Sequence, residues 1–160
     1  MAHMLRDHPF CAPLDVDRLF RRILVSVLLG NNDAHLKNFG MRYRGNRLEL
    51  APFYDVLAAA LYPEYSRTGM ALRLGPGSNP VDLAGINERH LLALAKSFGL
   101  KKAALTEAAR TLAGRLERAQ QVVQNSPHGS PSLKDQLTEY MRRRWNGSFQ
   151  PMLASTGKRS

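Results

Sequence analysis

Apolar side chains between residues 15 and 29 recur every three or four positions, which is the period of an α-helix. After Arg22 the stretch is almost continuously apolar, so we expect the second half of this helix to be buried. Asp15 is a suitable N-cap for the helix, and Gly30 is a suitable residue to end it. The apolar positions are Val16, Leu19, Phe20, Ile23, Leu24, Val27 and Leu28.

Later stretches show the same spacing and predict further helices over residues 87–98, 101–124 and 131–145. Asn87 can cap the first of these, and Gly99 can end it. Ser130 followed by Pro131 suits the start of the last one, with residues 125–130 as a linker. Each helix carries one apolar stripe that must be covered. We therefore expect a mainly α fold in which these helices pack against the helix of residues 15–29.

The segment of residues 31–40 is too rich in Asn, Asp and His to continue the first helix, and we interpret it as a polar loop. A small β-hairpin is predicted directly after it, because Gly45-Asn46 lies between short alternating runs at residues 41–43 and 48–50. Residues 56–61 resemble the opening turns of a buried helix, and residues 71–74 a short strand. Most of residues 67–85 is predicted to be loop.

Length and composition favour a single domain, since 160 residues with 44% apolar content can bury one core. We expect a leading segment at residues 1–14, of which Met1–Met4 resembles a cloning remnant. The domain is predicted over residues 15–146, and a frayed polar tail over 147–160. No apolar stretch is long enough for a membrane span, so a cytoplasmic protein is expected. The single cysteine, Cys11, excludes an internal disulfide, and its surroundings give no support for a zinc site.

The net charge of +10, from 23 Lys and Arg against 13 Asp and Glu, can attract nucleic acid, acidic proteins or nucleotide phosphates. The basic residues are spread over many segments, and only Arg142, Arg143 and Arg144 form a run. Solvated helix faces are the favoured interpretation of this charge. Direct nucleic-acid binding is not indicated beyond the charge itself.

The residues that can carry out chemistry are Asp33, Asn38 and Asp55, which lie close together in the sequence. Phosphoryl transfer from a nucleotide needs a carboxylate that accepts the hydroxyl proton, and oxygen ligands that hold magnesium against the phosphates. Asp33 and Asn38 lie on one turning loop, and the hairpin brings Asp55 back towards that loop. The order of these three residues along the chain predicts a kinase-type site in one polar pocket. Asp33 and Asn38 are also residue types that favour turns, so a purely local backbone-capping role is the alternative for these two.

The segment Leu28-Leu29-Gly30-Asn31-Asn32-Asp33-Ala34-His35-Leu36-Lys37-Asn38-Phe39 is similar to the catalytic segment of HipA-like serine/threonine kinases. Leu50-Ala51-Pro52-Phe53-Tyr54-Asp55-Val56-Leu57 resembles their second metal-site segment. The resemblance covers about residues 15–125. It implies a fold like the C-terminal lobe of protein kinases, ATP and Mg²⁺ as cofactors, and a toxin role in bacterial toxin–antitoxin modules.

The resemblance also implies roles for individual residues. Asp33 matches the catalytic base, Asn38 and Asp55 the magnesium ligands, and His35 and Tyr54 contacts to the nucleotide. From the residues alone, His35 can equally be a surface loop histidine, and Tyr54 can be a packing residue. Lys37 can hold a phosphate or merely a helix-facing carboxylate, and the sequence does not decide between them. Trp145 is interpreted as a packing residue rather than a binding platform.

The chain departs from complete kinases in one respect. No Gly-rich phosphate loop and no lysine-bearing strand precedes Asp15. We therefore expect a separate N-terminal lobe as a partner and little activity from the chain alone. An antitoxin and a protein substrate, such as one of translation, are further partners that the family implies. The alternative is a non-catalytic binding module or degenerate toxin fragment that holds an antitoxin or another partner.

Overall fold

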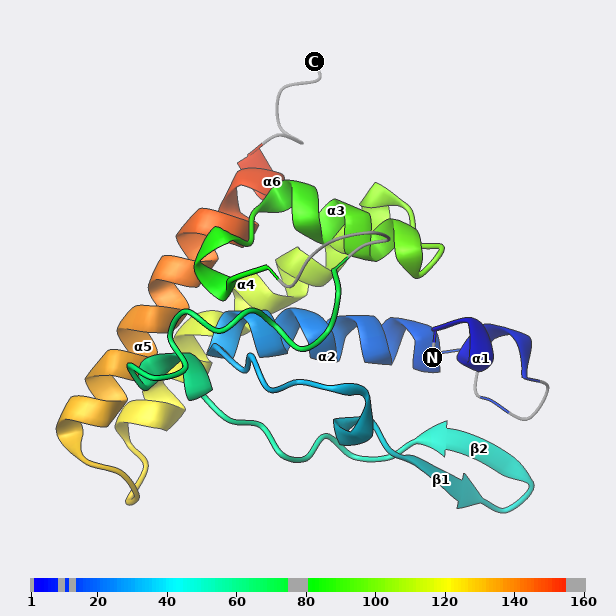
Figure 1. The fold of residues 1–160 in the computed structure, drawn as a ribbon, viewed down its shortest axis with the longest axis horizontal. Helices are drawn as coiled ribbons and strands as arrows, with labels where there is room; N and C mark the ends of the chain where they lie inside the picture. Colours follow the sequence, from blue (N-terminus) through cyan, green and yellow to red (C-terminus); the bar gives the residue numbers. More distant parts are fainter. Residues whose placement is uncertain (1, 9–10, 12–13, 75–80, 155–160) are drawn as a thin grey trace.

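The computed structural model describes residues 2–8, 11, 14–74 and 81–154. Helix α2 (Asp15–Leu29) runs through the middle of the molecule, with a hairpin of β1 (Met41–Arg44) and β2 (Arg47–Leu50) on one side (Figure 1). The remaining helices lie mostly on the other side and at the end of α2 (Figure 1). They are α1 (Ala2–Asp7), α3 (Glu88–Ser97), α4 (Lys102–Gln124), α5 (Pro131–Arg144) and α6 (Gln150–Ala154).

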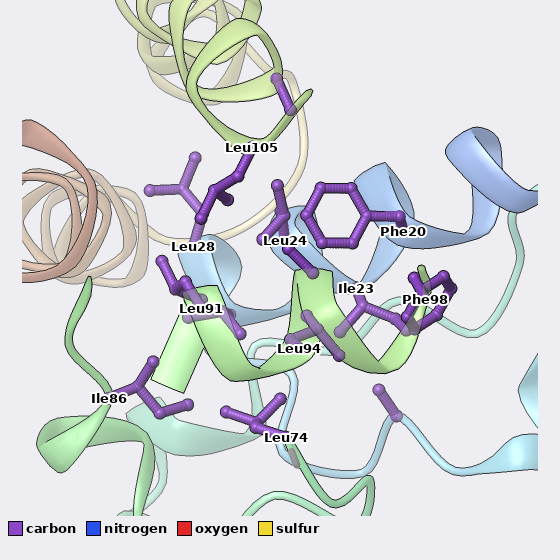
Figure 2. Close-up of a cluster of buried hydrophobic side chains, with 14 of the residues drawn as sticks. Phe20, Ile23, Leu24, Leu28, Leu74, Ile86, Leu91, Leu94, Phe98 and Leu105 are labelled. Atoms are coloured by element: carbon purple, nitrogen blue, oxygen red, sulfur yellow. The ribbon is translucent and has the colours of Figure 1, made fainter. Parts of the chain in front are cut away.

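The core lies between α2, α3 and the start of α4. Figure 2 shows Phe20, Ile23, Leu24 and Leu28 of α2 among side chains of the neighbouring helices, which include Leu91, Leu94, Phe98 and Leu105. The rings of Phe20 and Phe98 lie 5.7 Å apart. Burying each large apolar side chain contributes about 1.5–3 kcal/mol, so this contact layer dominates the stability of the fold. The prediction of a mainly α fold with a small hairpin is confirmed.

The predicted helix ends are mostly confirmed. Gly30 ends α2 in the left-handed conformation with φ 79°. Asn87 forms a capping box with His90 at the start of α3. The Ser130 side chain accepts a hydrogen bond from the backbone of Leu133, and Pro131 occupies the first turn of α5. Local sequence signals therefore set these helix boundaries.

Asp15 is not the N-cap of α2, and this prediction is wrong. The cap position is Leu14, and the carboxylate of Asp15 is fully buried. It accepts a hydrogen bond of 2.7 Å from the backbone N–H of Leu50 and one of 2.9 Å from Arg18. The carboxylate thus satisfies a strand donor that would otherwise be buried without a partner. Asp15 fastens β2, and with it the hairpin, to α2.

The hairpin has the predicted position, with antiparallel pairing that runs from Met41 opposite Leu50 to Arg44 opposite Arg47. Gly45 at its turn has φ 59°, which glycine adopts without strain. The strands extend one residue further into the turn on each side than the sequence predicts. The hairpin places the polar loop before β1 beside the segment after β2.

Two short elements predicted from the sequence are absent. Residues 56–61 contain only the 3₁₀ turn η2 (Ala59–Leu61), and Val56 and Leu57 are exposed. The left-handed backbone of Asp55 directs the chain away from a helical start. Residues 71–74 form no strand, because the backbone N–H of Ala71 donates to Asn32 O instead of to a neighbouring strand. Leu74 is buried in the core, which explains its apolar signal.

The tail predicted over residues 147–160 is ordered as far as Ala154. A π-helical turn η4 (Trp145–Phe149) continues α5 into α6, and Phe149 and Met152 are buried. Trp145 stacks on Phe149 at 5.7 Å, as its packing interpretation requires. Trp145, Phe149 and Met152 follow helical spacing, which was the signal for this extension. Residues 155–160 of the predicted tail lie outside the described residues.

The leading segment also contributes to the fold. Residues Ala2–Asp7 form α1, and Leu5 of this helix is buried in the core. The 3₁₀ turns η1 (Leu36–Asn38) and η3 (Leu83–Gly85) complete the elements of the described ranges. Within those ranges, every helix is too short or too polar to cross a membrane.

Candidate active site

The polar loop begins where α2 ends, and two buried asparagines hold it in place. The side-chain amide of Asn31 donates to Asp55 O at 3.4 Å. The amide of Asn32 donates to Tyr65 O at 2.7 Å and to Thr68 O at 3.4 Å. Both side-chain amides thus donate to backbone carbonyls of the segment that follows the hairpin, which is distant in sequence. The loop and this segment run side by side below α2 (Figure 1).

Asp33 and Asn38 are joined by the folding of the loop between them. The backbone carbonyl of Asp33 accepts from the N–H of His35 at 2.7 Å and from the Asn38 side-chain amide at 3.2 Å. Asn38 is buried, so its side chain has a fixed orientation. Its amide oxygen and the exposed carboxylate of Asp33 have no hydrogen-bond or ion-pair partner among the described residues. Both oxygens are available to a ligand.

Asp55 has a strained backbone, with φ 54°. It is the sole non-glycine residue with a positive φ in the described ranges, and such a conformation costs about 1–2 kcal/mol. The Asn31 amide holds its carbonyl, while its exposed carboxylate has no partner among the residues that the structure describes. Strain at an exposed carboxylate with fixed backbone is typical of functional positions.

Tyr54 makes a second connection between the loop and the Asp55 segment. Its hydroxyl donates to Lys37 O at 2.8 Å. A Cβ at Gly40 would come within 3.0 Å of this hydroxyl, so any larger residue there would push against the tyrosine. The tyrosine therefore has a structural role, although its side chain remains 44% exposed beside the site.

His35 and Lys37 differ in their environments. His35 is half-buried, and its Nδ1 atom is buried without a hydrogen-bond partner among the described residues, which does not fit a simple surface histidine. Lys37 is exposed, and its side chain forms no ion pair with a carboxylate of the described chain. The alternative in which Lys37 holds a carboxylate is therefore not observed in the described part. Both side chains remain free to contact a ligand.

Arg22 fixes the path from β2 to the site, a role that the sequence did not indicate. Its Nη1 donates to Ala51 O at 2.6 Å, and its guanidinium lies 5.6 Å from the centre of the Phe53 ring. Burial lowers the pKa of Arg22, an effect that nearby Asp15 opposes and Arg18 reinforces. Phe53 also stacks on Phe39 of the loop at 6.3 Å. These contacts position the backbone immediately before Tyr54 and Asp55.

The donor set fits a magnesium ion that also binds phosphate. The described residues contain no group of three or more His, Cys, Asp and Glu side chains arranged to hold a metal. Asp33, Asn38 and Asp55 would supply two carboxylates and one amide oxygen, which are the oxygen ligands that magnesium prefers. Magnesium commonly takes its remaining ligands from water and substrate phosphates, so an all-protein cage is not required.

Sequence reasoning found the chemical groups but missed their supports, Asn31 and Asn32. Two consecutive asparagines directly after a buried helix were the available signal, because such amides are costly to bury without partners. The structure brings Asp33, Asn38, Asp55 and Tyr54 into one hydrogen-bonded region. That their free oxygens meet at one ion stays a prediction.

Comparison with known proteins identifies relatives that are named as putative kinases. A "Putative kinase" of Haemophilus influenzae is 47% identical over 58 residues, which cover 35% of this chain and 17% of the relative. "Putative kinase Y4mE" of Sinorhizobium fredii is 39% identical over 61 residues, covering 38% of this chain and 14% of the relative. "Putative kinase Y4dM" of the same organism is 34% identical over 97 residues, which cover 60% of this chain and 23% of the relative.

These matches cover less than a quarter of the length of each curated relative. A model of the HipA-like C-terminal domain matches residues 1–121, which is most of the chain and includes the whole loop and the Asp55 segment. The resemblance read from the two sequence segments is thereby confirmed. The chain belongs to the family of HipA-like C-terminal domains.

Proposed function

We propose that this chain is the C-terminal lobe of a serine/threonine protein kinase that uses ATP and Mg²⁺. One observation carries the proposal: Asn31 and Tyr54 join the loop to the Asp55 segment, while the carboxylates of Asp33 and Asp55 remain without protein partners in the described structure. A purely structural role for these aspartates would be expected to use their side chains as acceptors. Because these two carboxylates have no protein partner in the described structure, they support a role in binding a ligand.

In the proposed reaction a protein hydroxyl attacks the γ-phosphorus of ATP. Asp33 accepts the hydroxyl proton, the new oxygen–phosphorus bond forms, and the bond to the β-phosphate oxygen breaks as ADP leaves. Asn38 and Asp55 would hold Mg²⁺, which neutralises charge on the phosphates when it is bound. His35, Lys37 and the exposed part of Tyr54 would contact the nucleotide. Positioning and electrostatics account for most of such catalysis.

A second lobe is part of the proposal, because the chain matches only a small part of its relatives. An exposed apolar stretch flanks Asp55 on both sides. Exposed apolar patches of this kind commonly mark contact surfaces. We place the nucleotide-holding lobe on this stretch, which comprises Tyr54, Val56, Leu57, Tyr62 and Tyr65.

The wider biological role follows from the family resemblance alone. It comprises a toxin activity in the cytoplasm, inhibition by an antitoxin partner, and a protein of translation as substrate. A second candidate function is a non-catalytic module that binds an antitoxin or another partner. The same exposed apolar stretch favours it, since a docking surface needs no chemistry.

A transfer assay with a matching N-terminal lobe added as a separate chain separates the candidates. For a kinase, Asp33→Asn should lower the rate roughly 10²–10⁴-fold, the usual contribution of a positioned proton acceptor. Asp55→Asn should abolish turnover, and raised magnesium should restore part of it. The chain alone should bind ATP weakly and transfer little phosphate. A complex that forms but transfers no phosphate would favour the binding module, and an unaffected Asp33→Asn complex would remove the base assignment.

A further inference from the structure

A large open hollow lies between α5 and the segment of residues 60–66. Its volume is about 620 Å³. The wall on the side of α5 carries both acidic and basic side chains, and the opposite wall includes Ser66. The lining residues that matter here are Ser66, Asp135, Glu139, Tyr140, Arg143 and Arg144. None of these residues belongs to the site described above.

Arg144 is a buried cation that has no counter-ion in the described part of the chain. The residue is 9% exposed, its Nη2 donates to Ala84 O at 3.3 Å, and its Nη1 is buried with no partner. No carboxylate of the described residues pairs with it, and the remaining residues of the sequence include no Asp or Glu side chain. A buried charge normally has a partner, because desolvation without one is costly. Arg144 thus has no anionic partner among the residues that the structure describes.

Tyr140 presents a second unpartnered donor beside the same hollow. Its hydroxyl is buried and has no hydrogen-bond partner within the described ranges. Burial raises the pKa of Tyr140, with Arg144 acting in the opposite direction, so its hydroxyl stays protonated as a donor. Its ring lies against Gly30, where a Cβ would come within 2.9 Å of the ring carbon Cε1. Tyr140, which lines the hollow, therefore also contacts the residue that precedes the polar loop.

The acidic residues of the hollow are already engaged. Glu139 pairs with Arg142 at 2.5 Å and lies 4.0 Å from Arg143. Asp135 accepts a hydrogen bond of 3.0 Å from Gln124. Asp82 is close enough to raise the pKa of Tyr140 but does not pair with Arg144. An additional anion in the hollow would therefore meet the positive charge of Arg144, which no carboxylate of the described residues compensates.

Ser66 is the hydroxyl-bearing side chain on the opposite wall. It is exposed, and its hydroxyl donates to Pro63 O at 2.9 Å. It lies between Tyr65 and Thr68, the residues whose carbonyls bind the Asn32 amide next to Asp33. A charge placed on Ser66 would therefore act on a segment bonded directly to the polar loop.

We propose that Ser66 is a phosphorylation site, and that its phosphate monoester binds Arg144 together with Arg143 and the Tyr140 hydroxyl. A protein kinase transfers the γ-phosphoryl group of a nucleoside triphosphate to Ser66 Oγ. The Oγ–P bond forms, the bridging P–O bond breaks, the nucleoside diphosphate leaves, and the serine proton passes to a carboxylate of that kinase. Rotation of the Arg144 and Tyr140 side chains towards the phosphate gives both donors an acceptor.

The consequence is regulatory. Phosphate bound to arginines orders the segment that carries it. Here that segment is tied to Asn32 on one side, and Tyr140 contacts Gly30 on the other. Phosphorylation would stabilise the loop of residues 31–38 from both directions. The proposal does not depend on kinase activity of this chain, because another kinase can supply the phosphate.

The test uses the full chain with phosphoserine incorporated at position 66 during synthesis. Phosphorus NMR measures the second pKa of the phosphate, which is about 6 without partners. A free peptide of residues 60–72 carrying the same phosphoserine serves as the reference. Pairing with arginine should lower the pKa in the chain by about one pH unit relative to the peptide.

Arginine variants identify the partner. Arg144→Gln and Arg143→Gln should each move the phosphate pKa back towards the peptide value, with the larger change for Arg144→Gln. Arg142→Gln is the matched control, since Arg142 lies on the same helix but not in the hollow, and it should leave the pKa unchanged. A pKa equal to that of the peptide would overturn the proposal. Arg143 is exposed, so Arg143→Gln stays informative if Arg144→Gln fails to fold.

Hydrogen exchange tests the regulatory consequence. Amides of residues 31–38 should exchange several-fold more slowly in the phosphorylated chain than in the unmodified one. The exchange rates of amides in α4 should not change, because α4 is not part of the contacts between Ser66, Tyr140 and the polar loop. Equal exchange of the loop amides in both forms would overturn the regulatory part of the proposal.

Discussion

The helical core and the polar site are held together by different forces. In the core, Phe20, Leu24 and their neighbours are buried through nondirectional contacts between helices. At the site, Asn31, Asn32 and Tyr54 donate single hydrogen bonds to backbone carbonyls distant in sequence. Hydrophobic burial tolerates changes of shape at similar volume, whereas a hydrogen bond depends on one donor and one acceptor. Substitutions in the two regions should therefore have different consequences.

The largest effect is expected from Leu24→Ala in the core. Leu24 is fully buried, so the substitution removes its contacts and leaves a cavity. We expect the free energy of unfolding to fall by about 2–5 kcal/mol, measured by urea denaturation. The loss should be global, with faster hydrogen exchange in α2, α3 and α4 together. The expected fall in the free energy of unfolding is at least about 2 kcal/mol. A fall below about 1 kcal/mol would mean that this layer is not the core.

Asn32→Ala should cost less and act locally. The variant removes the donor to Tyr65 O and Thr68 O, and unmade hydrogen bonds in a buried setting cost about 1–3 kcal/mol. Exchange should accelerate in residues 62–71 and in the polar loop, and remain slow in α3. Asn87→Ala, which removes a helix cap elsewhere, is the control and should leave residues 62–71 unchanged. Uniform acceleration throughout the chain would contradict the contrast between the two regions.

Asp55→Gly should separate stability from function. Glycine adopts the left-handed backbone without the penalty of a side chain, so unfolding should become harder by about 1 kcal/mol. The same change removes a proposed metal ligand and should abolish metal binding. Asp55→Asn provides the comparison, because it keeps a residue tolerated in this conformation. If Asp55→Gly destabilises the chain, the backbone at Asp55 is not strained in the native state.

Tyr54→Phe is expected to have the smallest effect on stability. It keeps the ring and deletes the hydroxyl that donates to Lys37 O, an exposed bond worth about 0.5 kcal/mol. Nuclear magnetic resonance should show shifted signals at Lys37 and Asp55 with the core unchanged. Absence of any change at Lys37 would show that this bond does not form in solution.

The sequence predicted those parts of the fold whose signals are local. Apolar periodicity located the long helices, and Gly30, Asn87 and Ser130 marked their ends as expected. Gly45-Asn46 located the hairpin. Each of these features depends on residues close together in the chain, so one segment suffices to predict it.

The sequence failed where a residue serves a distant partner. Asp15 looked like a helix cap but binds the backbone of Leu50. Residues 71–74 looked like a strand because Leu74 is buried, although Ala71 bonds to Asn32 instead. The candidate groups of the site were predicted from their types and order in the chain together with the family resemblance, whereas the contacts of Asn31 and Asn32 required the structure. Such long-range pairings are not encoded in local propensity or periodicity.

The central claim, that the polar loop and the Asp55 segment share one cation site, can be tested with manganese as a paramagnetic substitute for magnesium. Amide signals around Asp33, Asn38 and Asp55 should broaden together at manganese concentrations that leave α4 unaffected. Asp55→Asn should weaken the broadening at all of these positions, because one ion is shared. Broadening of the loop without the Asp55 segment, or at neither, would contradict the account.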